Sequence, residues 1–309
     1  MRSKKLAIVG LASLLSLALI SFSCISVPIG NKIAVISLDG AIASQSSFFG
    51  SSITPELVKG QLDKAEKDIT AKAIVLRVES PGGVVAPCQE ILEEINKVKQ
   101  SKPIVVSMRS MAASGGYYIS AGADSIIALP GTLTGSIGVI SQIPNVKGLY
   151  EKLGIEMQTF KGGKYKDMYS GFRELTSEEN EIMQKMTDEY YEQFVEVVAE
   201  GRGLSKDTVR NLATGQLYTG VEAKKLGLVD ELGGLDTAIA VAARLANIKT
   251  WQVEYYRPKV SFLESLLGMG FGSLVDVVQL KLLGLSGEDI VLLQTLSHAY
   301  PQPQFLYIS

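Results

Sequence analysis

The sequence is poor in the residues that build metal and disulfide sites: it has one histidine and two cysteines among 309 residues. Two cysteines, Cys24 and Cys88, are too few for a disulfide framework or a multi-cysteine zinc site. A single histidine excludes multi-histidine metal sites. Because that histidine, His298, lies near the carboxyl end, a His-based catalytic triad would depend on a residue of the tail.

The sequence also lacks an excess of positive charge. It holds 30 Lys and Arg against 32 Asp and Glu. Three of the bases precede residue 31 and all of the acids follow it, so the remainder carries a net charge of −5. This balance argues against a nucleic-acid partner, which would require a basic surface. With 46% hydrophobic and 20% charged residues, the chain is neither disordered throughout nor a polytopic membrane protein.

One long uncharged segment covers residues 6–31. A helix needs ~20 apolar residues to cross a bilayer, and this segment is long enough. The bases before it should stay in the cytoplasm, which places the rest of the chain outside; they are Arg2, Lys4 and Lys5. Three alternatives to an uncleaved anchor remain: a signal peptide cleaved before Cys24, after the small-x-small triplet 21–23, a lipoprotein modified at Cys24, or a buried helix of a soluble protein. Ser21 is a poor match for the second alternative.

The body alternates between strand and helix patterns. Apolar, β-branched runs predict strands over residues 32–40, 73–78, 103–108 and 125–129. Helical spacing predicts a helix beginning at Thr54-Pro55-Glu56, another through residues 91–98, a long one over 176–202 and small ones within 204–248. This alternation predicts an α/β fold with mainly parallel pairing.

Three glycine-containing turns fall where predicted strands meet helices: Ser80–Gly83, Ser114–Gly116 and Thr134–Gly138. Such turns line the ligand crevice of α/β sheets, and paired glycine amides can form an oxyanion hole. A serine beside such a turn can be a nucleophile. The structural alternative is that the glycines only allow close packing of strand and helix. No turn matches a phosphate-binding loop.

A serine nucleophile needs a base, and the sequence offers His298 or a lysine kept neutral by burial. A lone tail histidine is more often a surface residue. The segment 161–167 holds three lysines, Lys161, Lys164 and Lys166, and could equally be a solvated basic loop. Lys161 and Lys164 lie among glycines and should be exposed. Lys166 is flanked by Tyr165, Met168 and Tyr169, so we expect it to be the buried one.

Taken together, several motifs in fixed order resemble the signal peptide peptidase A family in its short, single-domain form. The resemblance covers residues 32–250, and its motifs are Ser80-Pro-Gly-Gly83, Met111-Ala-Ala-Ser114-Gly-Gly-Tyr-Tyr118, Thr134-Gly-Ser-Ile-Gly138, Lys164-Tyr-Lys-Asp167, Gly215-Gln-Leu-Tyr-Thr-Gly220 and Gly227-Leu-Val-Asp-Glu-Leu-Gly-Gly234. It implies a Clp-protease-like, crotonase-like spiral of ββα units. It also implies a membrane-anchored serine protease that degrades signal peptides and other hydrophobic peptides through a Ser/Lys dyad.

The resemblance assigns roles by position. They are Ser114 as nucleophile, Lys166 as general base, Ser136 as hydrogen-bond partner of the lysine, and Gly83 and Gly115 as the oxyanion hole, with Gly82 supporting its turn. No metal or cofactor is implied. The family forms ring-like homo-oligomers, and in short members the serine and lysine of one site can come from neighbouring subunits.

Two parts of the chain depart from the family pattern. Ser170-Gly-Phe-Arg173 replaces the more frequent S-P-F-R, which should loosen a turn locally. Residues 251–309 have no confident counterpart. Their apolar positions over 262–283 are amphipathic, which is typical of a core or oligomer-contact helix or of a membrane-surface helix. The tail 305–309 could pair with a groove as a peptide does.

These observations predict three regions: an anchor or signal segment over 1–31, a protease domain over 32–250 and an extension over 251–309. We expect a single-pass membrane serine endopeptidase with its catalytic domain on the extracytoplasmic side. The alternatives are a related membrane protease that cuts a stomatin-like partner, a crotonase-type acyl-CoA enzyme that uses a Glu or Asp, and an inactive scaffold of the same fold.

Overall fold

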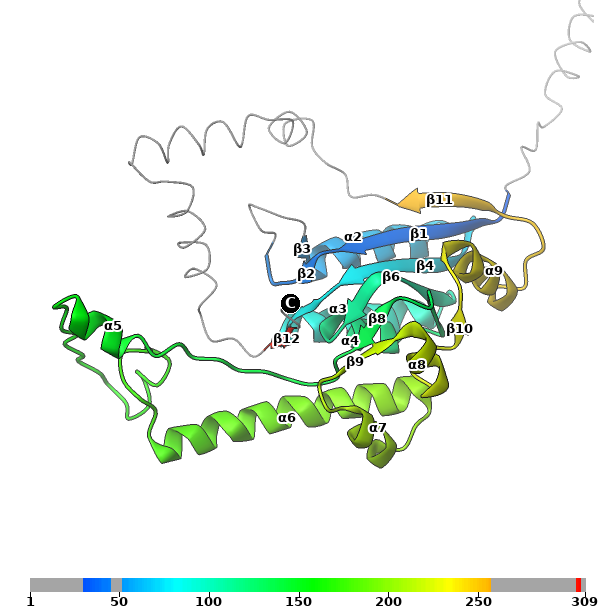
Figure 1. Cartoon of the computed structure of the whole chain (residues 1–309). Coiled ribbons are helices and arrows are strands. Elements are labelled where there is room, and N and C mark those ends of the chain that lie inside the picture. Colours follow the sequence, from blue (N-terminus) through cyan, green and yellow to red (C-terminus); the bar gives the residue numbers. More distant parts are fainter. Residues whose placement is uncertain (1–29, 46–51, 257–303, 307–309) are drawn as a thin grey trace, which may run out of the picture.

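The computed structural model describes residues 30–45 and 52–256, together with the backbone of residues 304–306 (Figure 1). An eight-stranded sheet forms the centre, with the order β10-β7-β6-β4-β1-β11; β8 pairs with β6 and β9. All pairs are parallel except β8 with β9. The strands are β1 (Lys32–Asp39), β4 (Ala71–Ser80), β6 (Ile104–Ala113), β7 (Ser125–Ala128), β8 (Leu133–Gly135), β9 (Leu217–Thr219), β10 (Glu231–Leu232) and β11 (Gln252–Tyr256).

A smaller sheet lies at the carboxyl end of β4, in the order β12-β5-β2-β3. Its members are β2 (Ala41–Ile42), β3 (Ser52–Ile53), β5 (Gly82–Val84) and β12 (Gln304–Leu306). The prediction of a tight turn over Ser80–Gly83 is therefore wrong in part. Gly82 and Gly83 belong to a strand, because segments distant in sequence supply its neighbours.

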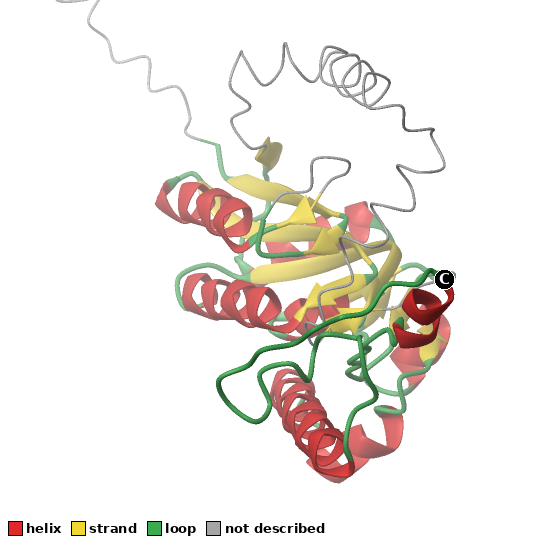
Figure 2. Cartoon of the chain, turned by 90° about the vertical axis from the view of Figure 1, so that its left-hand side faces the viewer, coloured by secondary structure: helices red, strands yellow, loops and turns green. Residues whose placement is uncertain are grey.

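Helices cover both faces of the large sheet. Strand β4 alternates: Ile74, Leu76 and Val78 belong to the larger core, whereas Ala73 and Val75 belong to the core beneath α9, as a buried strand requires. Figure 2 shows helices lying along the strands. The helices are α2 (Pro55–Lys67), α3 (Val85–Lys99), α4 (Gly115–Ala121), α5 (Lys147–Lys152), α6 (Ser177–Arg202), α7 (Lys206–Leu212), α8 (Gly220–Lys225) and α9 (Leu235–Leu245).

The sequence predicted the helix starts well because they depend on local capping. The Thr54 hydroxyl accepts a hydrogen bond from the Leu57 amide at 3.3 Å, with proline in the first turn of α2. Thr176 and Glu179 form a reciprocal capping box at the start of α6, as this residue pair favours. The α/β class with mainly parallel pairing is confirmed.

Residues 139–175, which we call the arm, connect β8 to α6 and contain α5. Figure 1 shows α5 at the far left, well away from α4 and β8. The arm exposes a set of large apolar side chains: Ile140, Leu149, Leu153, Ile155, Met157 and Phe160, the last of them 93% exposed. A surface this apolar is more typical of a contact region than of a free loop.

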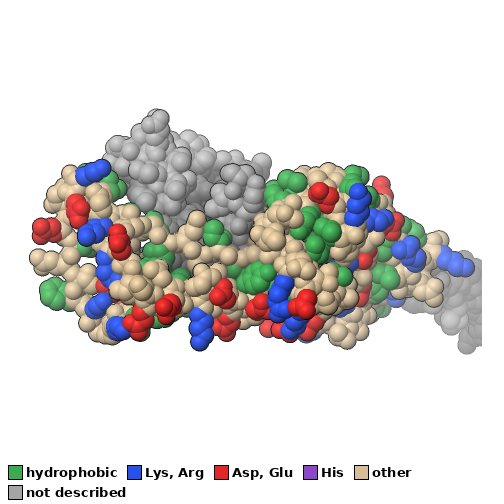
Figure 3. Space-filling view, turned by 60° about the horizontal axis from the view of Figure 1, so that its bottom comes forward, with side chains coloured by type: hydrophobic (Ala, Val, Ile, Leu, Met, Phe, Trp, Pro, Cys, Tyr) green, Lys and Arg blue, Asp and Glu red, His purple; other side chains and the backbone are tan. Residues whose placement is uncertain are grey.

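The surface around α6 carries no patch of one charge sign. On the face shown in Figure 3, Lys and Arg side chains are interspersed with Asp and Glu. None of the helices within the described ranges is long and apolar enough to span a bilayer. The predicted anchor, apart from residues 30 and 31, lies outside the described residues, as do residues 257–303.

Candidate active site

Ser114 occupies a sharp turn between β6 and α4. Its backbone has φ 53° and ψ −117°, a conformation that side-chain-bearing residues rarely adopt and that costs about 1–3 kcal/mol. Two backbone hydrogen bonds hold it: the Ser114 amide donates to Gly135 O at 2.8 Å, and its carbonyl accepts from the Tyr118 amide at 2.8 Å. A strained serine between a strand and a helix is the geometry of a nucleophile elbow.

The two glycines assigned to the oxyanion hole lie side by side. A Cβ built on Gly115 would be 3.1 Å from the Gly83 amide nitrogen and 2.7 Å from Cys88 Sγ. A Cβ on Gly83 would be 1.9 Å from the carbonyl oxygen of Ile42. Both positions therefore exclude a side chain. Gly115 is the first residue of α4, where an amide has no acceptor within the helix, so it is available to an oxyanion.

Gly82 supports this arrangement through its backbone conformation. Its φ of 111° lies in the region that favours glycine. Its amide donates to Ser80 Oγ at 3.2 Å. This conformation at the start of β5 presents Gly83 to α4.

Ser136 lies on the segment next to Ser114. Ala113 pairs with Gly135 in the β6–β8 ladder, so Ser114 and Ser136 each follow one member of this pair. Ser136 also has positive φ, 48°, and its amide donates to Gln216 O at 2.8 Å. Both serines are buried, with 1% and 6% of their surface exposed. The Gly215–Gly220 motif positions Ser136 by this contact, and residues 217–219 form β9 rather than a helix.

Lys166 is not brought to Ser114 within the chain. It lies in the part of the arm between α5 and α6, a segment that Figure 1 shows away from α4. It is also exposed, so the expectation that its neighbours would bury it is wrong for the single chain. Met168 is buried in its place, and the Tyr165 hydroxyl bonds to Glu178.

The arm nevertheless distinguishes Lys166 from the other two lysines. Lys161 Nζ lies 2.6 Å from Asp167 Oδ1, and Lys164 forms an ion pair with Glu178, which raises the pKa of Lys164. Among the described residues, the Lys166 amine has no hydrogen-bond or ion-pair partner. Lys166 is therefore the one of these three lysines whose amine is free of an ion pair within the part of the chain that the structure describes.

Arg173 fixes the segment that carries Lys166. Its guanidinium bonds to both oxygens of Asp167, at 2.9 and 2.7 Å, and to both oxygens of Glu179, at 2.7 Å each. These bonds hold the pKa of Asp167 well below its usual range and lower that of Glu179 to about 2. Bidentate pairs of this kind add geometric specificity. This cluster was not predicted, although the Arg in the Ser170–Arg173 motif was visible.

The backbone conformation at position 171 explains why this chain has glycine where the family pattern has proline. Gly171 has φ 70°, and a Cβ there would lie 2.3 Å from the carbonyl oxygen of Pro144. Proline, fixed near φ −65°, could not adopt this conformation. The Gly171 carbonyl also accepts a hydrogen bond from the Val146 amide at 2.8 Å. Gly171 therefore closes the arm onto itself, where the sequence suggested only a looser turn.

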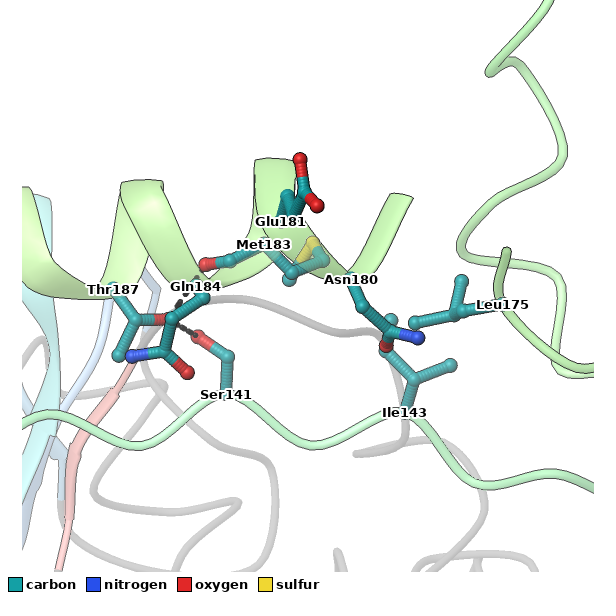
Figure 4. Close-up of a pocket in the computed structure, with 8 residues that line it drawn as sticks. All are labelled: Ser141, Ile143, Leu175, Asn180, Glu181, Met183, Gln184 and Thr187. Atoms are coloured by element: carbon teal, nitrogen blue, oxygen red, sulfur yellow. Dashed lines mark hydrogen bonds between the residues drawn. The ribbon is translucent and has the colours of Figure 1, made fainter. Parts of the chain in front are cut away.

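Strand β5, beside the elbow, pairs with an extended segment from the end of the chain. Residues 304–306 pair antiparallel with β5, and Phe305 lies opposite Gly83. The expectation that the tail 305–309 could pair as a peptide does is confirmed for the backbone of residues 305 and 306. By contrast, a hollow of about 480 Å³ lies between the first part of the arm and α6, away from Ser114. Figure 4 shows it lined by side chains such as Ser141, Ile143 and Met183.

The remaining candidates lie elsewhere. His298 falls outside the described residues. Cys88 is buried directly beneath Gly115, and burial raises the pKa of its thiol, so it serves as packing for the elbow. The described residues contain no group of three or more His, Cys, Asp or Glu that could hold a metal ion.

Comparison with known proteins agrees with this geometry. The model of peptidase family S49 matches residues 96–249, and the Clp protease model matches residues 39–134. A candidate protease of Methanocaldococcus jannaschii is 43% identical over 63% of each chain. A candidate signal peptide peptidase SppA of Enterococcus faecium is 39% identical, covering 77% of this chain and 70% of its own. Protease 4 of Salmonella typhi is 38% identical over 79% of this chain but only 39% of its own length.

These matches bear on one of the alternatives, the acyl-CoA enzyme. A crotonase-type acyl-CoA enzyme is not supported, because both family models and the relatives above describe proteases. The elbow at Ser114 lies inside the stretch that both models cover. The chain belongs to peptidase family S49 and is a serine protease of the signal peptide peptidase A type.

Proposed function

We propose that this protease degrades hydrophobic peptides, including released signal peptides, through a dyad of Ser114 and Lys166. The observation that carries the proposal is the pairing of an extended segment with β5, opposite Gly83 and beside Ser114. Peptides bound by strand addition are held through their backbones. A protease that binds in this way can accept many sequences, as disposal of varied peptides requires.

The proposed mechanism uses only groups of the chain. Ser114 Oγ attacks the peptide carbonyl carbon while the neutral amine of Lys166 takes the hydroxyl proton. The amides of Gly83 and Gly115 hydrogen-bond the oxyanion. As the C–N bond breaks, the lysine returns the proton to the leaving amine, and water then hydrolyses the acyl-enzyme. Ser136, next to Ser114, would hydrogen-bond the lysine and hold it in place.

The dyad would be completed between two copies of the chain. Within one copy Lys166 is exposed, and the arm that carries it extends away from α4 and displays an apolar surface. Docking of the arm onto a neighbouring copy would cover that surface and desolvate the lysine, which lowers an amine's pKa. A repeated contact of this heterologous kind gives a ring when the rotation between copies closes. The ββα spiral of the family would supply the body of each subunit.

Residues 6–31 would anchor this assembly in the membrane, with the catalytic domain outside the cytoplasm. Signal peptides left in the bilayer would then lie near the enzyme. The uncharged run and the three bases before it support this placement.

A fluorophosphonate probe tests the nucleophile directly, because it modifies activated serines. We expect labelling of the wild type and none of Ser114→Ala, together with loss of peptidase activity. Ser110→Ala is the matched control, since Ser110 lies on the same strand but is exposed, and it should behave as wild type. Continued labelling and cleavage by Ser114→Ala would refute the assignment.

A further inference from the structure

The large sheet has an edge where its strands begin, and the entry to β1 lies on it. The Lys32 amide donates to Thr70 O at 2.7 Å, and the Gln252 amide donates to Asn31 O at 2.9 Å. The entry to β1 is therefore flanked by the turn before β4 on one side and by the start of β11 on the other. Each neighbour is about 4.8 Å away. Figure 1 shows β1 and β11 starting at the same end.

Large apolar side chains are exposed at this edge. Ile69, in the turn before β4, is 75% exposed, and Trp251, directly before β11, is 38% exposed. Leu245, the last residue of α9, is 45% exposed and lies six residues before Trp251. Tryptophan is enriched where protein meets the lipid–water boundary, because its ring is apolar and its N–H is polar.

Lysines surround these apolar side chains. Lys67, Lys72 and Lys249 are exposed. Lys67 is explained by its position in the last turn of α2, where a cation is favoured. Lys72 and Lys249 belong to no helix, so that explanation does not apply to them. The Asp68 carboxylate accepts bonds from the Thr70 and Tyr256 hydroxyls at 2.6 Å each, so it is occupied internally.

The segment that precedes β1 in the sequence indicates what lies next to this edge. The uncharged run 6–31 ends one residue before β1 begins at Lys32. No linker separates the two. If the run spans the bilayer, as in the function proposed above, the lipid head groups must lie within a few residues of the β1 entry.

We infer that this edge, formed by Ile69, Leu245 and Trp251 with Lys72 and Lys249, rests on the membrane surface. The apolar side chains would enter the head-group layer, and the lysines would contact lipid phosphates. The inference rests on the proposed anchor, but it adds an orientation that an anchor alone does not fix.

The chain offers a direct probe, because Trp251 is its single tryptophan. The full chain would be reconstituted in vesicles of phosphatidylcholine and phosphatidylglycerol, and flotation would establish that it stays with them. Fluorescence would then be measured with a head-group spin-labelled lipid and, separately, with acrylamide in the aqueous phase. The control is Trp251→Phe combined with Leu129→Trp. Leu129 is 45% exposed and follows the carboxyl end of β7, at the opposite edge of the sheet.

We expect the spin-labelled lipid to quench Trp251 more than the control tryptophan, and acrylamide to do the reverse. Replacing Lys72 and Lys249 with glutamine should reduce lipid quenching in anionic vesicles. The matched change of Lys224 and Lys225, exposed on α8, should not. Equal lipid quenching at both positions would overturn the inference, as would protection of Trp251 from both quenchers, which would indicate a second copy. Failure to float would overturn the anchor with it. Peptidase activity of the same samples reports on the proposed dyad separately.

Discussion

The separation of Lys166 from Ser114 within one chain leads to a quantitative prediction. Ser114→Ala and Lys166→Ala should each be inactive, and mixing them should restore activity. In a ring, each site would take its serine from one copy and its lysine from the next. Half of the copies in an equal mixture keep the serine and half keep the lysine, so roughly a quarter of the sites are intact.

The assay is cleavage of a hydrophobic fluorogenic peptide after the two purified variants have exchanged subunits. Exchange would be followed with two different fluorescent labels, so that it is known to have occurred. Lys161→Ala and Lys164→Ala are matched controls, because these lysines lie in the same loop but pair with Asp167 and Glu178; each should keep activity by itself. Demonstrated exchange without any return of cleavage would refute the shared site, because sites within one chain would each lack one group.

Four further predictions follow from the site and the arm. Gly115→Ala should lower thermal stability, by about 1–3 kcal/mol for overpacking, and Cys88→Ala should restore part of the loss because it removes the Sγ that lies 2.7 Å from the new Cβ. Deleting residues 304–309 should raise the rate of peptide cleavage at low substrate concentration, and the free hexapeptide should inhibit competitively, because the tail occupies β5; an unchanged KM would contradict this. Peptidase activity should rise with pH into the alkaline range, since the base must be neutral and an ordinary lysine titrates at ~10.4; His298→Ala should leave the pH profile unchanged. The pKa of Glu179 is lowered to about 2. The stabilisation that its carboxylate gives the arm is therefore present above pH ~4.3 and is lost as the pH falls toward 2. Limited proteolysis at acidic pH should accordingly cut the arm before the rest of the chain, and arm cleavage that does not change with pH would refute the role of the ion cluster.

The parts of the fold that the sequence predicted are those set by neighbours along the chain. Thr54 and Thr176 each cap a helix by accepting a hydrogen bond from the amide three residues later. The apolar composition of β4 by itself indicates a buried strand. The three glycine-containing segments lie close together because parallel strands end at the same edge of a sheet, as the contacts of Gly83 with Gly115 and of Ala113 with Gly135 show. Gly83 was misread as part of a turn, because its strand partners come from residues 41–42 and 304–306.

The exposure of Lys166 could not be predicted from the sequence for a different reason. The aromatic and apolar residues around it predicted burial, yet Met168 is buried while Lys166 is exposed. Hydrophobic neighbours in the sequence indicate that a segment has an apolar surface to bury, but they do not say whether its own chain or a second copy buries that surface. Lys161 pairs with Asp167 within the loop itself, but the partner of Lys164 is Glu178 of α6, and the local sequence does not place α6 beside the loop.

The proposed membrane contact and the site lie at opposite ends of the same strands, and this separation constrains the substrate. The ten residues of β6 span about 30 Å in a parallel strand, and Ser114 directly follows the last of them. If the amino edge rests on the bilayer, a peptide still embedded in lipid cannot reach Ser114 unless it extends about ten residues beyond the surface. Strand addition to β5 needs several more residues in extended form. Peptides that have loosened from the membrane would therefore be favoured over intact membrane-spanning segments, and this preference would protect the anchored proteins around the enzyme.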